Sequence, residues 1–496
     1  MLSKVFSYKL LVPVHFQPVT EIPSGKGILY ISSIDGKRFE KSVIPISTKA
    51  ISGDVNIVVD VRKMFQSIVG FGGAFTDSVG INLNSLSEQT RRNLLEAYFS
   101  ENGIQYNLGR VPIASTDFST REYSYADKVD DFEMKSFSLA EDDYKYKGSG
   151  SLKEEVNGRY YRSYAVYLMK LVVYLCLLKK EVISTYFTTA FIYVDSPNLK
   201  SLLEFSKRLF FNFLRFFEEY AKNGVLYWGM TLQNEPFTGV LPFYKWQTTL
   251  FTAQTQRDFV KVTIGPLFKG NNFTAHLKIM ALDDSRIFLP GWADTIYGDP
   301  DAAKYVDGIG VHWYFNNFMP AKILTVTHNR YPEKFILATE ACTGSLFVHG
   351  PILGDWYRAE EYAEDIIMNL NNYVVGWTDW NMCLNEQGGP TWVNNFVDSP
   401  IIVNATADEF YKQPMFYAMG HFSKFIKSGA VRIDTKVVGS QKILATSVVY
   451  QGRRTVVLIN KKSTPTSVSV NDALTKQYLH FTVAPHSIVT LLWDKQ

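Results

Sequence analysis

The middle of the chain alternates short apolar runs with segments of helical length, and the apolar runs end in polar residues. Alternating strands and helices predict a parallel α/β fold. Polar residues at the carboxyl ends of the strands favour a closed (β/α)8 TIM barrel, whose active site lies on that face. Two of the expected helices cover residues 87–99 and 359–370. The expected strands cover residues 67–75, 105–112, 225–233, 277–282, 307–312, 334–339 and 373–380.

The two ends of the chain have a different pattern. Residues 28–60 and 432–493 consist of short β-type runs separated by turns, so we expect one accessory β-sandwich domain built from both termini. The predicted division gives residues 1–60 and 416–496 to the sandwich and residues 61–415 to the catalytic barrel. The glycine-rich GFGGAF run does not match the GxGxxG pattern, which argues against a dinucleotide-binding fold.

Composition excludes several classes of protein. The chain has 496 residues and a net charge of +3, and it has no run of basic residues that would suggest nucleic-acid binding. Its three cysteines, Cys176, Cys342 and Cys383, are too few and too scattered for a disulfide framework. No cluster of His, Cys, Asp and Glu has metal-site spacing and no cofactor loop is present, so we expect neither a metal nor a cofactor.

Two glutamates stand at the ends of expected strands, Glu235 in YWGMTLQNEPF and Glu340 in KFILATEAC. On a barrel both would face the same pocket. Glycosidases use two carboxyl groups, which are about 5 Å apart for retention and farther apart for inversion; the sequence leaves this separation open. A glutamate at a strand end can also form a salt bridge or cap a helix. The Asn-Glu-Pro context favours catalysis, because Asn234 could donate to a sugar 2-hydroxyl.

A long series of collinear motifs carries a resemblance to a known family. They include GFGGAFTDSVGINLNSLS, NLGRVPIASTDFSTREYSYAD, TLQNEPFTG, GIGVHWY, TEAC and FYKQPMFYAMGHFSKFI, and they cover most of residues 28–143 and 215–496. On these motifs the chain resembles the lysosomal glucosylceramidases (acid β-glucosidases) of glycoside hydrolase family 30, in their invertebrate form.

The resemblance implies a role for each candidate site residue. It makes Glu235 the acid/base and Glu340 the nucleophile. The substrate-binding residues that it implies are Asp117 for the sugar hydroxyls, Arg110 beside the nucleophile, Asn234 and His312 in the pocket, Trp380 and Asn395 around the glucose, and Tyr244 and Tyr314 at the mouth. On the residues alone, Arg110 could equally be a core ion pair and His312 a packing residue. Cys342 is expected to be a small buried residue, not a nucleophile.

The activity that the resemblance implies is retaining hydrolysis of glucosylceramide to glucose and ceramide. It also implies a lysosomal location, an anionic lipid surface and a saposin-type activator protein. The start of the chain does not resemble a signal peptide, so the location rests on the resemblance. Two alternatives remain open: an impaired or non-catalytic glycolipid-binding relative, and a β-xylosidase or β-galactosidase.

One region departs from the family pattern. The tryptophan-containing segment that supplies barrel strand three is missing near residue 147. Residues 171–214 form an atypical insert. The insert interrupts an expected helix, which begins in residues 161–170 and resumes at residue 215. One hypothesis is a skipped exon with a translated intron. The other is a variant chain in which residues 181–194, rich in β-branched and aromatic residues, fill the slot. That variant would have weak activity or none.

Overall fold

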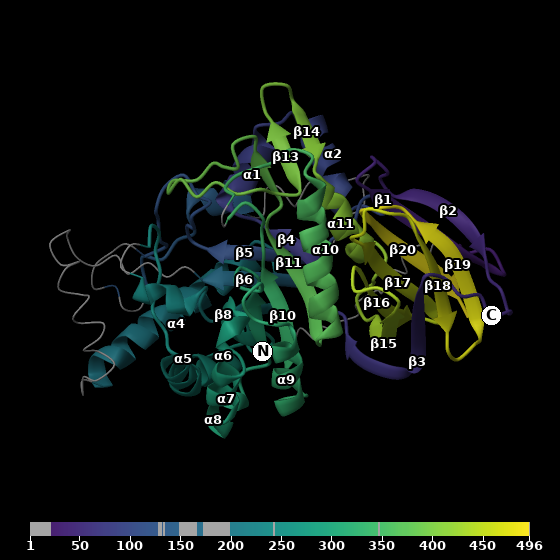
Figure 1. The fold of residues 1–496 in the computed structure, drawn as a ribbon. Coiled ribbons are helices and arrows are strands. Elements are labelled where there is room, and N and C mark those ends of the chain that lie inside the picture. Colours follow the sequence, from purple (N-terminus) through teal and green to yellow (C-terminus); the bar gives the residue numbers. More distant parts are fainter. Residues whose placement is uncertain are drawn as a thin grey trace, which may run out of the picture.

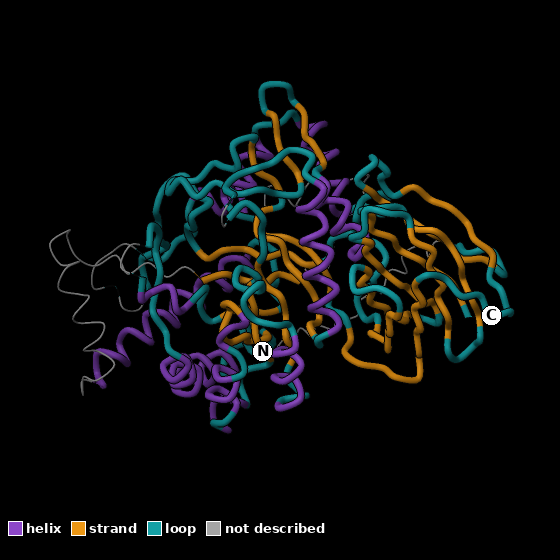
Figure 2. The backbone as a smooth tube through the Cα atoms, in the orientation of Figure 1, coloured by secondary structure: helices purple, strands orange, loops and turns teal. Residues whose placement is uncertain are grey.

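The computed structural model describes residues 21–126, 131, 134–147, 166–171, 199–241, 244–345 and 348–495, and of residues 166–171 and 199–210 it describes the backbone alone. A barrel of strands and helices and a domain made of strands lie side by side (Figure 1). In Figure 2 the helices gather around the barrel, and the second domain is almost entirely strand and loop.

The barrel is an eight-stranded parallel sheet in the order β6-β5-β4-β11-β10-β9-β8-β7. The two ends of this order, β6 and β7, contact each other and close the sheet. The predicted TIM barrel is therefore confirmed. Its strands are β4 (Gly70–Ala74), β5 (Leu108–Ile113), β6 (Val166–Leu171), β7 (Gly229–Thr231), β8 (Lys278–Ser285), β9 (Gly308–His312), β10 (Phe335–Glu340) and β11 (Val374–Asn381).

Helices follow the barrel strands, and side-chain caps define where several of them begin. The Ser87 side chain accepts from the backbone N–H of Thr90 at the start of α2, and Asp355 caps α10 in the same way. The helices are α1 (Asp77–Asn84), α2 (Glu88–Phe99), α4 (Leu199–Lys222), α5 (Ala253–Phe259), α6 (Gly265–Lys269), α7 (Gly291–Tyr297), α8 (Pro300–Ala303), α9 (Lys322–Arg330), α10 (Trp356–Asn371) and α11 (Pro414–Ser423), with short turns η1 (Asp143–Lys147), η2 (Pro236–Val240), η3 (Val260–Ile264) and η4 (Arg286–Phe288).

The strand-three slot is filled differently from our expectation. β6 pairs in parallel with β5, so the helix predicted for residues 161–170 is wrong over residues 166–170. An unpaired β5 edge would break the closed barrel, and this long-range pairing outweighs the local helical pattern. Residues 161–165 lie outside the described residues, as do residues 181–194, the alternative candidate for the same slot.

The second domain is a nine-stranded sheet in the order β19-β18-β3-β15-β16-β17-β20-β1-β2. The sandwich built from both termini is confirmed, since β1 pairs with β20 and β3 pairs with β15. A bridge between Ser47 and Tyr478 brings the two edges of the sheet together. Its strands are β1 (Lys26–Ser33), β2 (Glu40–Pro45), β3 (Val55–Ser67), β15 (Val431–Val438), β16 (Ile443–Tyr450), β17 (Arg453–Asn460), β18 (Thr466–Asp472), β19 (Gln477–Val483) and β20 (Ser487–Asp494). A separate small sheet joins β12 (Cys383–Asn385), β13 (Ile401–Asn404) and β14 (Glu409–Lys412).

Buried polar contacts fix the two domains to each other. The Gln66 side chain, on β3, donates to the carbonyl oxygens of Leu370 at 2.6 Å and Val374 at 3.0 Å. The buried His421 ring, on α11, lies 2.9 Å from the Ser32 hydroxyl and 2.8 Å from the Thr490 hydroxyl. Because a buried polar group without a partner raises the free energy of the folded state, these contacts specify one orientation of the domains.

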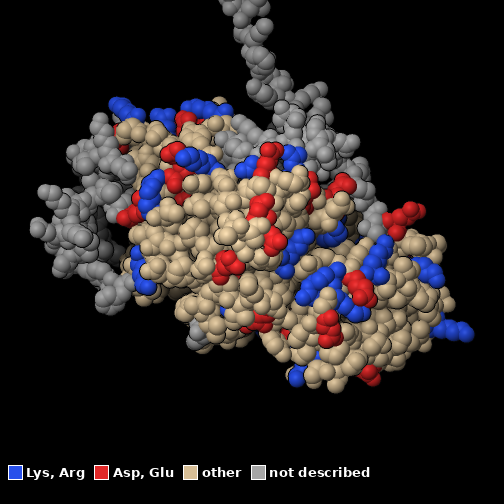
Figure 3. Space-filling view, turned by 90° about the horizontal axis from the view of Figure 1, so that it is seen from above, with Lys and Arg blue, Asp and Glu red and all other residues tan. Residues whose placement is uncertain are grey.

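Charges of both signs are mixed on the face drawn in Figure 3, in keeping with the nearly balanced net charge of +3. Within the described part of the chain, no helix combines the length and the apolar character needed to cross a bilayer.

The closeness of β4 to β5 predicts the effect of one substitution. A methyl group at Gly72 would lie 1.8 Å from the carbonyl oxygen of Leu108, so Gly72→Ala must force the two strands apart. We expect this overpacking to lower the free energy of unfolding by about 1–3 kcal/mol, measured by thermal or urea denaturation. Gly291→Ala is the control, because a methyl group there meets no atom within 4 Å. Equal stability of the two variants would contradict this account of the barrel.

Candidate active site

The carboxyl ends of the barrel strands bring the predicted site residues to one face. Glu340 and His312 are the last residues of β10 and β9, and Arg110 lies on β5. Glu235 follows β7 and begins the short turn η2. Because all these strands run in parallel, their carboxyl ends converge on the same pocket.

The two glutamates face each other. A carboxylate oxygen of Glu235, one of Glu340 and a ring nitrogen of His312 lie within 4.8 Å of one another. The Glu340 side chain is 4% exposed and that of Glu235 is 14% exposed. Two carboxyl groups are thus close together in a space that excludes most water, and one is more open than the other.

Glu340 is held by two donors. Arg110 Nη1 donates to Glu340 Oε2 at 2.6 Å, and the Tyr314 hydroxyl donates to Oε1 at 2.8 Å. A charged donor and a hydroxyl donor both stabilise an ionised carboxylate. The contacts therefore favour the charged form of Glu340, which is the form that can act as a nucleophile.

Glu235 adopts a left-handed backbone conformation with φ of 42°. Its N–H donates to the carbonyl oxygen of Asp283 at 2.9 Å, which fixes this turn against β8. In its side chain, Oε1 lies 3.0 Å from His312 Nδ1, and Oε2 accepts from the Tyr244 hydroxyl at 3.0 Å. A non-glycine residue in this conformation costs about 1–3 kcal/mol, and such strain is kept where the surroundings hold it.

Asp283, on β8, is a residue of this pocket that we did not predict from the sequence. It is fully buried and accepts from Arg110 at 2.9 Å, from His312 at 3.1 Å and from the Thr339 hydroxyl at 2.6 Å. Burial alone would raise the pKa of Asp283, but Arg110 and His312 hold it well below its ordinary range. The signal in the sequence was the Asp283–Asp284 pair directly after the apolar run 277–282.

His312 carries a positive charge in this setting. Burial on its own would lower the pKa of His312, but the negative charges of Glu340 and Asp283 raise it to about 10. The protonated ring can donate from Nε2 to Asp283 and from Nδ1 to Glu235. This geometry makes His312 a bridge between the buried anion and the more open glutamate.

The remaining candidate residues surround this centre. Asn234 Oδ1 accepts from Arg110 Nη2 at 3.1 Å, and the Arg110 guanidinium lies 5.7 Å from the centre of the Trp380 ring. Asn395 Nδ2 donates to Asp117 Oδ2 at 2.9 Å. Burial raises the pKa of Tyr244, with further contributions from Glu235, Asp117 and Glu340, so Asp117 belongs to the same pocket. The structure thus brings all ten candidate residues together.

Cys342 is buried beside the pocket, and burial raises the pKa of its thiol well above the ordinary value. A buried neutral thiol is a weak nucleophile. Among the described residues, Glu235, His312 and Glu340 form a group whose atoms are close enough to hold a cation. However, Arg110 and the protonated His312 already supply positive charge there. This set of groups is better suited to proton transfer than to binding a metal cation.

Comparison with known proteins shows the family of the chain. The glycosyl hydrolase family 30 TIM-barrel domain matches residues 68–148 and 203–426, and the β-sandwich domain of the same family matches residues 429–491. The chain belongs to glycosyl hydrolase family 30. The match to the barrel breaks off at residue 148, next to the place where the sequence lacks the expected strand-three segment.

Individual relatives cover nearly the whole chain. The lysosomal acid glucosylceramidase of Mus musculus is 38% identical, over 100% of this chain and 96% of its own length. The Caenorhabditis elegans protein named "Putative glucosylceramidase 3" is 46% identical over 97% of this chain and 90% of its own length. The solved structure of SrfJ from Salmonella typhimurium has the same fold, with a TM-score of 0.79 at 23% identity, covering 95% of this chain and 100% of the SrfJ chain.

The charge of His312 predicts a pH dependence of stability. The pKa of His312 is raised from 6.5 to about 10, so its ion pairs stabilise the fold fully below pH 6.5 and lose this effect as the pH rises through about 10. His312→Gln should therefore reduce the free energy of unfolding more at about pH 5 than at about pH 9, measured by urea denaturation.

The control for this experiment is His480→Gln, since His480 is exposed on the sandwich. It should leave the stability unchanged at either pH. A loss in His312→Gln that is the same at both pH values would contradict a protonated His312.

Proposed function

We propose that this protein hydrolyses the β-glucosidic bond of glucosylceramide with retention of configuration, releasing glucose and ceramide. The observation that carries the proposal is the approach of Glu235 and Glu340 to within 4.8 Å. Retaining glycosidases place their carboxyl groups about 5–5.5 Å apart, whereas inverting ones leave about 6.5–9.5 Å for a water molecule. The glucosylceramidase names of the relatives support the choice of substrate.

In the first step, Glu340 attacks the anomeric carbon while Glu235 donates its proton to the departing ceramide oxygen. The bond from the anomeric carbon to ceramide breaks, and an ester bond to Glu340 forms. Arg110 and Tyr314 keep Glu340 ionised until it attacks. The Tyr244 hydroxyl can accept a hydrogen bond from Glu235 in its acid form or donate one to its carboxylate form, so it can hold both states in place.

In the second step, Glu235 acts as a base. It removes a proton from a water molecule, which attacks the anomeric carbon and displaces Glu340. The His312 ring donates to the Glu235 carboxylate at 3.0 Å and stabilises this basic form. Two displacements at the same carbon restore its original configuration, and both glutamates return to their starting states.

The sugar itself would be held by the residues around the two glutamates. Asp117 and Asn395, already joined by a hydrogen bond, would bind sugar hydroxyls. Because Asn234 accepts from Arg110 through its amide oxygen, its amide nitrogen can donate to the 2-hydroxyl. Trp380 would offer the face of its ring to the apolar face of the glucose.

The setting of the reaction is also a proposal. We place the protein in the lysosome, on an anionic lipid surface and with a saposin-type activator protein. The support is its 38% identity to a relative named as lysosomal. Ceramide release from vesicles with and without anionic lipid, each with and without a saposin, measures this dependence.

Glu340→Gln should reduce hydrolysis of a fluorogenic β-glucoside at acid pH to the uncatalysed background, because an amide cannot form the ester intermediate. The rate of aglycone release measures this, and NMR of the first-formed sugar gives the configuration. Glu333→Gln is the control, since the exposed Glu333 precedes the same strand at the opposite end of the barrel.

Each open alternative has its own outcome in this experiment. If the wild-type protein and Glu340→Gln are equally inert on all the glycosides tested, the proposed hydrolysis fails and the impaired or non-catalytic alternative is favoured. Faster release from a β-xyloside or β-galactoside would replace the proposed substrate, and an inverted product would overturn the mechanism.

Glu235→Gln should separate acid catalysis from nucleophilic attack. Loss of the general acid should slow the first step by about 10²–10⁴-fold for a poor leaving group. For an activated leaving group such as a dinitrophenolate, which needs no proton, the first step should be largely spared. A burst of dinitrophenolate before a slow steady rate is the expected signature. An equal loss for both leaving groups would argue against Glu235 as the acid.

A further inference from the structure

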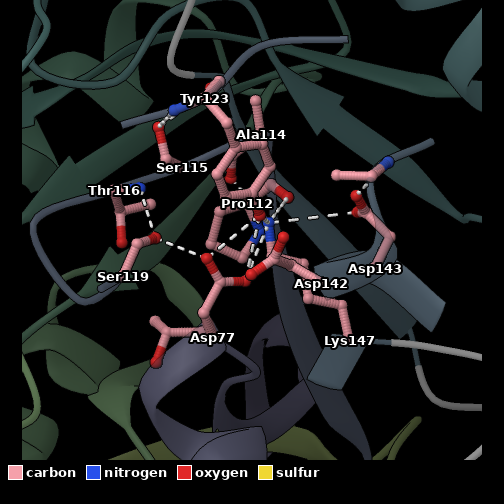
Figure 4. Close-up of polar contacts among 12 residues, drawn as sticks. Asp77, Pro112, Ala114, Ser115, Thr116, Ser119, Tyr123, Asp142, Asp143 and Lys147 are labelled. Atoms are coloured by element: carbon pink, nitrogen blue, oxygen red, sulfur yellow. Dashed lines mark hydrogen bonds and ion pairs between the residues drawn. The ribbon is translucent and has the colours of Figure 1, made fainter. Parts of the chain in front are cut away.

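Lys147 is a buried lysine outside the chemistry of the two glutamates. It is the last residue of η1, and its side chain is 1% exposed. Figure 4 shows its ammonium group among oxygen atoms of several segments. Lys147 Nζ donates to the carbonyl oxygen of Ala114 at 2.6 Å and to the Tyr123 hydroxyl at 2.8 Å, and it lies 3.3 Å from Asp77 Oδ1. A buried charge is tolerated only with such a complete set of partners.

The same cluster controls the turn at the end of β5. Ala114 has a φ of 62°, a left-handed conformation that few residues other than glycine adopt. Its carbonyl group is taken by Lys147, and its N–H donates to the Tyr125 hydroxyl at 2.9 Å. Tyr125 in turn donates to Asp143, at the start of η1, at 2.5 Å. Residues of η1 therefore hold both backbone polar groups of Ala114, the carbonyl directly through Lys147 and the N–H through Tyr125 and Asp143.

This turn leads into residues 115–123, here called the 115–123 loop, which carries Asp117. Asp77, at the start of α1, holds this loop by accepting from the hydroxyl groups of Ser119 and Tyr123. The Ser119 hydroxyl also accepts from the backbone N–H of Thr116 at 3.0 Å. The contacts to Lys147 and Asp77 thus lie on both sides of Asp117 along the chain.

We propose that Lys147 is a positioning residue for sugar binding. Its ammonium group fixes Ala114, Tyr123 and Asp77. These contacts hold the 115–123 loop in the position in which Asp117 faces the sugar. This inference rests on the proposed function of Asp117. Lysine suits the position because it can donate up to three hydrogen bonds and because its charge compensates the buried Asp77 and Asp143, at 3.3 and 3.9 Å.

The first variant to test is Lys147→Met, which keeps the apolar stem and removes the ammonium group. A binding group displaced by a fraction of an ångström should reduce kcat/KM for a β-glucoside by about 10- to 100-fold. The loss should appear mainly as a higher KM, because Asp117 would bind the ground state and the transition state alike. Lys145→Met is the control, since Lys145 lies in the same turn, is 55% exposed and pairs with Glu141. It should behave as the wild type does.

A double-mutant cycle with Asp117→Asn distinguishes positioning from general destabilisation. If Lys147 acts through Asp117, adding Lys147→Met to Asp117→Asn should change KM little further. Fully additive losses would overturn the inference. If Asp117→Asn is impaired but Lys147→Met is not, the inference about Lys147 fails while the sugar-binding role of Asp117 stands. An unaffected Asp117→Asn would overturn the sugar-binding role of Asp117, and the inference with it.

A milder variant covers the case in which Lys147→Met does not fold, as judged by circular dichroism. Tyr123→Phe removes only the hydroxyl group that lies between Lys147 and Asp77. It should raise KM less than Lys147→Met, and this rise should disappear in the Asp117→Asn background. An unchanged KM in Tyr123→Phe would overturn the inference.

Discussion

The pocket depends on the buried guanidinium of Arg110. Its side chain has no exposed surface, and it joins β5 to Asp283 at 2.9 Å, to Glu340 at 2.6 Å and to Asn234 at 3.1 Å. Removing water from a charge costs several kcal/mol, and only a full set of partners offsets that cost. The contacts that stabilise the barrel at this point are therefore also the contacts that keep Glu340 ionised.

The charges of the pocket balance in a way that suits proton transfer. Arg110 and the protonated His312 offset Asp283 and Glu340, and these four groups together are nearly neutral. Glu235 lies beside this nearly neutral group of four. Its greater exposure, 14% against 4% for Glu340, lets it exchange a proton with a water molecule. This difference in environment suits the different roles that we propose for the two chemically identical side chains.

The contacts that hold Glu235 come from residues that follow the atypical insert at residues 171–214. Glu235 is held from Asp283, His312 and Tyr244. The chain on either side of that region also converges, because Asp143 accepts both from Tyr125 and, at 2.9 Å, from Tyr220 of α4. The described contacts that position Glu235, which we propose as the acid/base, therefore come from the part of the chain that follows the insert.

The sequence by itself determined the barrel, the sandwich and the position of Glu235 and Glu340 at strand ends, because these follow from local patterns and from the shared direction of parallel strands. Only the tertiary structure decided that Asp283 binds Arg110, that His312 is charged and that Lys147 reaches Asp77. It also placed residues 166–170 in a strand where the local pattern indicated a helix. Burial, charge pairing and strand closure join residues far apart in the chain, and a local pattern carries no record of such contacts.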